Sequence, residues 1–227
     1  MDARQKKTRD IAAEIAAEIL TEIPSKKRLV VLQRELAKCT ACPQMIGPVV
    51  HGPPIVSRIY LLGQAPGPHE GKIGRPFAWT AGKTLFRWFQ EEVGVDEKTF
   101  RERIYMSAVA RCFPGKAKGG GDRKPAPDEI ERCERFVSRE VEILEPRLVL
   151  PIGALAISRV LGEIGKLDTI IGRVLRAKYH GVDVDVIPLP HPSGASTWHR
   201  VEPGKTLLLK ALQKIKEHPE VQASLLK

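Results

Sequence analysis

Residues 58–77 read RIYLLGQAPGPHEGKIGRPF and indicate the fold class of this chain of 227 residues. The first six, RIYLLG, form a short apolar run bounded by glycine and proline, which is typical of a buried strand. The residues after Gly63 are rich in glycine and proline, which predicts a loop. A loop at the carboxyl end of a buried strand is where α/β sheets bind their ligands.

Further buried strands are expected outward from this segment, at residues 103–110 (RIYMSAVA), 147–152 (RLVLPI) and 184–189. Helices are expected at about residues 81–93, 128–144, 153–161 and 204–216. A hairpin is expected at about 174–186, turning at His180-Gly181. Strands that alternate with helices are typical of parallel sheets. The sequence therefore predicts a three-layer α/β/α sandwich with a central parallel four-stranded sheet.

The ends of the chain have a different pattern from this central part. Residues 1–22 carry Ile11, Ile15 and Ile19 at helical spacing among charged residues, which predicts an amphipathic helix. A second helix, at about 27–38, leads directly into Cys39. We expect residues 1–25 to be a helical extension, residues 26–217 the main domain and residues 218–227 a C-terminal tail.

Positive charge dominates the composition. Lysine and arginine number 37 against 27 aspartate and glutamate residues, so the formal net charge is +10. Such an excess favours a polyanionic partner, most commonly nucleic acid. No secretion signal is visible, and no apolar run approaches the roughly 18 residues of a membrane span. We expect a cytoplasmic monomer with no membrane partner.

The chain has four cysteines, of which the first two form a CxxC motif. Thiols in a reducing cytoplasm are more often metal ligands or catalytic groups than disulfides. Four thiolates suit either a zinc ion or a [4Fe–4S] cluster, and geometry alone does not separate the two. The expected ligands are Cys39, Cys42, Cys112 and Cys133. Their expected role is structural, ordering the basic loop at residues 116–124.

Several loop motifs occur together. The segment GQAPGPHE at 63–70 is followed by GRPF at 74–77, by AG at 81–82 and by HPS at 191–193. In this combination the chain resembles the uracil-DNA glycosylase superfamily, over about residues 36 to 215. The best resemblance is to its iron–sulfur class, called family four, whose motif reads G-E-x-P-G-x-x-E. That class places four cluster cysteines as they stand here.

The resemblance implies a role for each motif residue. The departing base is an anion, so its carbonyl oxygen needs a hydrogen-bond donor, which His191 would supply. Glu70 would orient or activate the attacking water, with Gln64 at the remaining catalytic position. Phe77 would stack on the flipped base. The backbone at Ala65 and Gly67 would approach the base edge and the sugar.

The resemblance also implies DNA contacts after the final strand. Ser193 would contact DNA, and Arg200 would meet phosphate or fill the vacated site. Trp198 would be an apolar wedge in the minor groove. For Trp198, packing in the core is the alternative. The lysines and arginines of residues 116–123 would also hold phosphates, which makes binding sensitive to salt.

Two positions depart from the family pattern. Gln64 stands where family four has a glutamate, so an acid is lost. Ala108 stands where the family has an asparagine that reads the edge of uracil, and the neighbouring Ser107 hydroxyl can make only one such bond. Relaxed recognition, including hypoxanthine or xanthine, is therefore an open alternative to strict uracil specificity.

The sequence leaves three functions open. The first is a monofunctional glycosylase of the base excision repair pathway that releases uracil and other deaminated bases with water as nucleophile. The second is a non-catalytic relative that binds nucleic acid or senses damage, which the two departures favour. The third is a zinc-stabilised α/β nucleotide hydrolase, which the four cysteines equally allow.

Overall fold

A computed structural model describes residues 23–194 and 196–226. The helix expected within residues 1–22 lies outside the described residues. The elements in chain order are α2 (Ser25–Ala37), β1 (Ile59–Gly63), α3 (Pro68–Ile73), α4 (Thr80–Trp88), the π-helix η1 (Phe89–Val93), α5 (Glu97–Arg103), β2 (Tyr105–Ala108), α6 (Pro127–Leu144), β3 (Leu148–Pro151), α7 (Gly153–Leu161), the 3₁₀-helix η2 (Leu167–Thr169), β4 (Leu175–Tyr179), β5 (Val182–Val186), the 3₁₀-helix η3 (Trp198–Arg200), α8 (Gly204–Glu217) and α9 (Pro219–Ser224).

The strands form one sheet in the order β2-β1-β3-β5-β4. Strands β2, β1, β3 and β5 pair parallel with one another, as predicted. The sheet has a fifth strand, because β4 pairs antiparallel with β5. These two strands are the predicted hairpin, and its turn residues His180 and Gly181 both have positive φ, at 45° and 84°. Two positive φ angles give the tight turn that matches the twist of paired strands.

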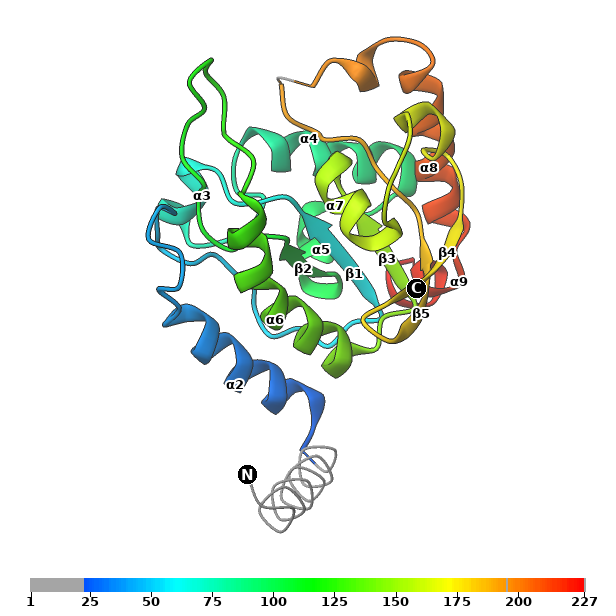
Figure 1. Ribbon diagram of the computed structural model, residues 1–227. Coiled ribbons are helices and arrows are strands. Elements are labelled where there is room, and N and C mark those ends of the chain that lie inside the picture. The colour runs from blue at the N-terminus through cyan, green and yellow to red at the C-terminus, as the bar shows by residue number, and fades with distance from the viewer. Residues whose placement is uncertain (1–22, 195, 227) are drawn as a thin grey trace, which may run out of the picture.

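Helices cover both faces of the sheet, as Figure 1 shows. Along β1 the side chains alternate, with Ile59 and Leu61 in one hydrophobic cluster and Tyr60 and Leu62 in the other. The first cluster includes side chains of α4, η1, α5 and α8, and the second includes side chains of α2 and α6. Side chains of successive strand residues point to opposite faces, so a run buried on both sides needs two helical layers. The predicted α/β/α sandwich is confirmed.

The loops that carry the motifs begin at one edge of this sheet. β1 ends at Gly63 and β2 at Ala108, which are partners in the parallel register. The chain leaving β5 continues to Leu189, which bridges to Ile152 beyond the end of β3. Because parallel strands share one carboxyl edge, the loops after Gly63, Ala108 and Leu189 meet there.

The last helices close the layer that packs against β1 through Ile59 and Leu61. Leu208, Leu212 and Ile215 of α8 are buried in that cluster. The segment expected as a tail contains α9, and its Val221 belongs to the same cluster. Within residues 23–194 and 196–226, no helix is both long enough and apolar enough to span a bilayer.

Candidate active site

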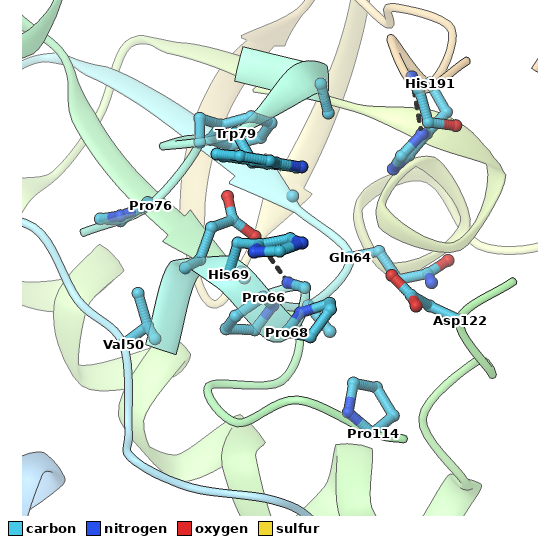
Figure 2. A pocket seen from close by; sticks show the side chains of 18 of the residues that line it. Val50, Gln64, Pro66, Pro68, His69, Pro76, Trp79, Pro114, Asp122 and His191 are labelled. Atoms are coloured by element: carbon cyan, nitrogen blue, oxygen red, sulfur yellow. Dashed lines mark hydrogen bonds between the residues drawn. The ribbon is translucent and has the colours of Figure 1, made fainter. Parts of the chain in front are cut away.

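A cavity of about 480 Å³ lies at the carboxyl edge of the sheet. It gathers residues from loops that are far apart in the sequence, as Figure 2 shows. Residues singled out in the sequence that line it include Gln64, Ala65, Gly67, Glu70, Phe77, Ser107, Ala108, His191 and Ser193. Trp198 and Arg200 do not line it. The loops after Gly63, Ala108 and Leu189 therefore all contribute residues to one cavity.

Phe77 packs against the end of β1. Its ring lies so close to Gly63 that a Cβ built there would be 3.1 Å from the ring. Its backbone has a φ of 51°, and its carbonyl would lie 1.8 Å from a Cβ at Gly82. The guanidinium of Arg101 donates to the carbonyl of Phe77 at 2.9 Å. Both glycines of these motifs are needed because the loop presses its aromatic residue against them.

Glu70 joins the two halves of the motif loop. One carboxylate oxygen accepts from the backbone N–H of Gly67 at 2.5 Å, and the other accepts from that of Ala78 at 3.2 Å. Burial raises the pKa of Glu70, although these backbone donors oppose the shift. The side chain therefore fixes the loop around the cavity, and both of its oxygens already have a donor.

His191 is held in a defined tautomer. The backbone N–H of Ser193 donates to its Nδ1 at 3.2 Å, so Nδ1 is the acceptor and Nε2 carries the proton. Burial lowers the pKa of His191, which keeps the ring neutral at pH 7. The ring packs on Gly153, where a Cβ would lie 3.1 Å from Cδ2. The site thus has a neutral N–H donor on its wall.

An aromatic pair that the sequence analysis missed forms part of the cavity wall. His69 and Trp79 stack with ring centroids 4.1 Å apart, and both line the cavity. Trp79 is 46% exposed, and the ammonium of Lys83 lies 5.9 Å from its ring. An exposed indole at a cavity mouth offers a stacking surface for a base. In the sequence, only the position of Trp79 close to the GRPF motif could have indicated that this side chain lies at the cavity.

A charged hairpin forms another part of the wall. Lys116 and Asp122 bridge its two arms, and the tip between them consists of small residues and one lysine. At its base, the guanidinium of Arg123 binds both carboxylate oxygens of Glu129, at 2.6 and 2.7 Å. The sequence indicated a basic loop at this place. It did not indicate that Asp122 lines the cavity.

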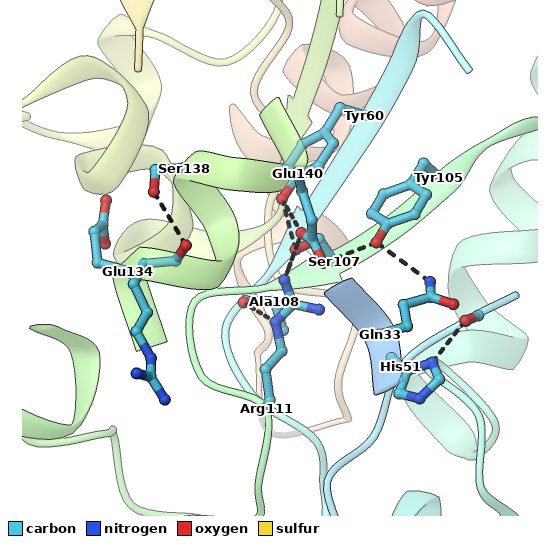
Figure 3. Close-up of polar contacts among 12 residues, drawn as sticks. Gln33, His51, Tyr60, Tyr105, Ser107, Ala108, Arg111, Glu134, Ser138 and Glu140 are labelled. Atoms are coloured by element: carbon cyan, nitrogen blue, oxygen red, sulfur yellow. Dashed lines mark hydrogen bonds and ion pairs between the residues drawn. The ribbon is translucent and has the colours of Figure 1, made fainter. Parts of the chain in front are cut away.

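Beneath the cavity lies a buried polar network, drawn in Figure 3. The hydroxyls of Tyr60 and Tyr105 donate to the two oxygens of Glu140, at 2.7 and 2.8 Å. The guanidinium of Arg111 donates to Glu140 at 2.5 Å and to Ser107 Oγ at 2.5 Å. Glu140 is fully buried and Arg111 is 1% exposed. A buried ion pair of this kind is tolerated only because each charge is hydrogen-bonded.

This network occupies the side chain of Ser107. Its hydroxyl accepts from Arg111 and lies 2.9 Å from Glu140, and the residue is 1% exposed. The hydroxyl expected to bond a base is therefore already partnered. Ala108, which follows it, contributes only a methyl group.

Trp198 and Arg200 lie in η3, away from the cavity lining. The indole Nε1 of Trp198 donates to Asp168 at 2.8 Å, and the ring packs partly buried against the core. The backbone there presses on α8, since a Cβ at Gly204 would lie 2.0 Å from the Trp198 carbonyl. Arg200 is exposed. The structure agrees with the packed alternative for Trp198, and its wedge role stays a prediction.

The four cysteines are all free thiols, and Cys112 lies close enough to the other three for their charges to act on it. The pKa of Cys112 rises to about 11, first through burial and then through the neighbouring thiols of Cys133, Cys39 and Cys42. The guanidinium of Arg135 lies 4.0 Å from the sulfur of Cys39. Four neighbouring thiols supply the type and number of ligands that a metal-thiolate site needs.

The described part of the chain contains no set of three or more His, Cys, Asp or Glu side chains close enough to hold a single metal ion. A zinc ion requires four sulfurs within roughly 4 Å of one another, because each Zn–S bond is about 2.3 Å long. The donor set of four cysteine thiols fits either an iron–sulfur cluster or a zinc ion in its chemistry.

Comparison with known proteins places this geometry in a family. Residues 49–216 match the family model of the uracil DNA glycosylase superfamily. A type-4 uracil-DNA glycosylase of Thermotoga maritima is 32% identical over 172 residues, covering 72% of this chain and 80% of that protein. One of Sulfurisphaera tokodaii is 28% identical over 143 residues and 61% of each chain. A type-5 enzyme of Thermus thermophilus is 30% identical over 119 residues, 48% of this chain and 52% of that protein.

The fold and the cavity together define an α/β protein with a cavity at the carboxyl edge of a mostly parallel sheet. The chain belongs to the uracil DNA glycosylase superfamily. It spans about three fifths of the Sulfurisphaera relative and four fifths of the Thermotoga relative.

Proposed function

We propose that this protein is a monofunctional DNA glycosylase that hydrolyses the N-glycosidic bond of uracil and other deaminated bases in base excision repair. The matched relatives are named uracil-DNA glycosylases, and the chain retains the cavity that such a reaction requires. Residues 26–217 are the proposed catalytic domain. The observation that carries the proposal is a neutral, tautomer-fixed His191 facing the same cavity as Phe77.

In this proposal the target nucleotide leaves the base stack and enters the cavity. Phe77 contacts one face of the base, and the Nε2–H of His191 donates to a carbonyl oxygen of the departing base. That donor lowers the barrier because negative charge develops on the base as the C1′–N bond breaks. A neutral imidazole is a suitable donor here, since it needs no proton from solvent before each turnover.

We infer that base recognition is relaxed. The family's asparagine is replaced by Ala108, and the hydroxyl of Ser107 is bound to Arg111 and Glu140. Side chains of β2 therefore offer no hydrogen bond to a base edge. Recognition then depends on the backbone of residues 64–67 and on the shape of the cavity, which discriminate less strictly between bases.

DNA phosphates are the proposed partners of the basic residues around the cavity mouth. Lys116, Arg123 and Lys124 line the cavity from the hairpin. Ser193 lines it from the loop after β5. Arg200 lies a few positions further along the chain and is exposed. Each phosphate contact of this kind releases counterions, so binding falls steeply with salt. One chain supplies every proposed side chain, consistent with a monomer.

A [4Fe–4S] cluster is the proposed occupant of the four cysteines, with zinc as the alternative. The support is the chemistry of the thiols and the resemblance to the family-four class. Cys39 and Cys42 follow α2, whereas Cys112 follows β2 and Cys133 lies in α6. A cluster on these ligands would hold together segments distant in the chain, and free thiols suit the cytoplasm.

The proposed reaction is tested on duplex oligonucleotides carrying uracil, hypoxanthine, xanthine or a thymine mismatch, scored for release of free base. We expect release of uracil and of at least one deaminated purine. Absence of release from every substrate would favour the non-catalytic, damage-binding alternative, provided that the protein still binds these duplexes.

The cluster is tested by absorption spectroscopy with iron and sulfide analysis. We expect a brown protein that absorbs near about 400 nm. The Cys39→Ala variant should lose colour and solubility together, because the site loses most of its affinity with one ligand. A colourless wild-type protein that contains zinc would replace the cluster with the alternative metal.

A further inference from the structure

The cavity has lost the acid of its first motif, and its remaining motif carboxylate is already engaged. Gln64 replaces the family's glutamate, and an amide neither accepts a proton from water nor carries negative charge. Both oxygens of Glu70 accept backbone N–H groups, from Gly67 and Ala78. Because those backbone bonds oppose protonation of Glu70, a carboxylate without such bonds would be better suited to receive the proton of the attacking water.

The hairpin of residues 116–122 brings another carboxylate to this place. Its arms are joined by the bridge between Lys116 and Asp122 and by the bond from Ala117 N to Gly121 O at 3.1 Å. Gly120 and Gly121 have φ angles of 85° and 72°, which allow the tip to turn. The bidentate bond between Arg123 and Glu129 fixes the base of the hairpin. Asp122 is thus held on a hydrogen-bonded frame.

Asp122 faces the cavity from the side of Gln64, as the two labelled side chains in Figure 2 show. Its Oδ2 lies 3.6 Å from the point where Gly67 would carry a Cβ. After the effect of burial, the charge of Asp122 is among the causes that raise the pKa of Glu70. It also opposes the burial-driven fall in the pKa of His191. Asp122 therefore acts electrostatically on both proposed site residues.

The two oxygens of Asp122 have different surroundings. Oδ1 binds the ammonium of Lys116 at 2.6 Å, which holds the side chain in place. Oδ2 approaches the small loop at Gly67, where the missing Cβ leaves room. One oxygen is thus anchored, whereas the other faces the cavity.

We propose that Asp122 is a catalytic residue of the glycosylase, supplying from the hairpin the carboxylate that position 64 lacks. This inference rests on the proposed function. The C1′–N bond breaks, and its electron pair leaves on the base, which takes a proton from solvent. A water oxygen forms the new bond to C1′, and the proton of that water passes to the Asp122 carboxylate.

The test compares D122N with D183N in single-turnover and steady-state base release from uracil-containing DNA. Asp183 is a matched control, because it also pairs with a lysine across a hairpin, at 3.4 Å from Lys178, but on the far edge of the sheet. We expect D122N to lower kcat by about 10²–10⁴-fold, typical of a general base, with KM changed only a few-fold. D183N should match the wild type.

A second variant, Q64E combined with D122N, returns an acid to the position that lost it. We expect at least a tenfold recovery of kcat over D122N, with unchanged binding to DNA carrying a non-cleavable uracil analogue. Three results would overturn the role of Asp122 in an active enzyme: D122N with wild-type kcat, binding lost in parallel with kcat, or no recovery in the double variant. A wild-type protein that releases no base would instead overturn the proposed function, and this inference with it.

Discussion

Two glutamates, Glu140 and Glu70, show how differently one chain uses buried charge. Glu140, in α6, is fully buried and receives bonds from two tyrosines, a serine and an arginine. Glu70, in α3, lies at the cavity and receives only backbone N–H groups. The first carboxylate is neutralised by a fixed cation, whereas the second shapes a loop.

The difference separates stability from activity. The network of Glu140 and Arg111 joins α6 to β1 and β2 in a region that water does not reach. The network also draws the Ser107 hydroxyl away from the cavity. The cavity side retains groups with unused bonding capacity, chiefly Nε2 of His191 and the carboxylate of Asp122. Substitutions on the two sides should therefore affect different measurements.

The largest effect is expected on the side of Glu140. The Glu140→Ala variant leaves the Arg111 charge buried without a counterion, which should lower the free energy of unfolding by about 3–5 kcal/mol. Urea denaturation measures this loss. The matched control is Glu142→Ala, because Glu142 is 69% exposed and its pair with Arg28 should contribute about 0–1 kcal/mol. Equal stability of the two variants would remove the network from its structural role.

On the cavity side, apart from D122N, the largest loss of activity is expected for His191→Ala. Removing a donor to a developing anion lowers kcat by roughly 10²–10³-fold, with little change in unfolding. Single-turnover base release measures the effect. A fall in kcat of less than tenfold would show that the anion is stabilised elsewhere.

The pH dependence of the wild-type enzyme sharpens the role of His191. Burial lowers its pKa, so protonation of the ring requires a pH below the ordinary histidine range. Activity that depends on the neutral ring should therefore persist below about pH 6.5 and be lost only as the pH falls through the lowered pKa. We expect this acid limb in the kcat profile of the wild type, and we expect the part of it that reports His191 to be absent in His191→Ala. A rise in kcat on acidification through that range would contradict a neutral donor.

A smaller effect is expected at Phe77. Replacing the ring by alanine should cost about 1–3 kcal/mol of base stacking, seen as a fall in kcat/KM. Phe77→Tyr keeps the aromatic face and should retain most activity. If alanine and tyrosine behave alike, the ring packs on Gly63 without touching the base.

The smallest effect is expected at Lys124, which follows the hairpin of residues 116–122. Lys124→Ala should weaken binding equally for all bases and reduce the slope of log affinity against log salt by about one. Fluorescence anisotropy across a salt series measures the slope. Lys178→Ala, on the opposite edge of the sheet, serves as the control, and an equal slope change there would show that contacts are not confined to the cavity side.

Short apolar runs were enough to predict the parallel strands, because a strand that is covered by helices on both faces has apolar side chains at nearly every position. The convergence of Gln64, Phe77 and His191 followed, since the loops after parallel strands share one edge. The hairpin β4–β5 was expected, but its addition to the sheet as a fifth strand was not. That pairing depends on tertiary packing and leaves little local signal.

Long-range polar contacts were beyond prediction. Nothing local marks Glu140 as the partner of Arg111, which lies 29 positions away. The position of Asp122 depends on where its hairpin is anchored, at Arg123 and Glu129. The sequence allowed two environments for Trp198. Its bond to Asp168 at 2.8 Å and the packing of its ring against the core identify the packed one.

The most direct test of a single cavity for the base is photocrosslinking with an oligonucleotide that carries 5-iodouracil at the target position. Mass spectrometry then identifies the crosslinked residue. The account predicts attachment to the cavity aromatics, Phe77 first and then Trp79 or His191. Attachment only to Trp198 or to residues outside the cavity would contradict it.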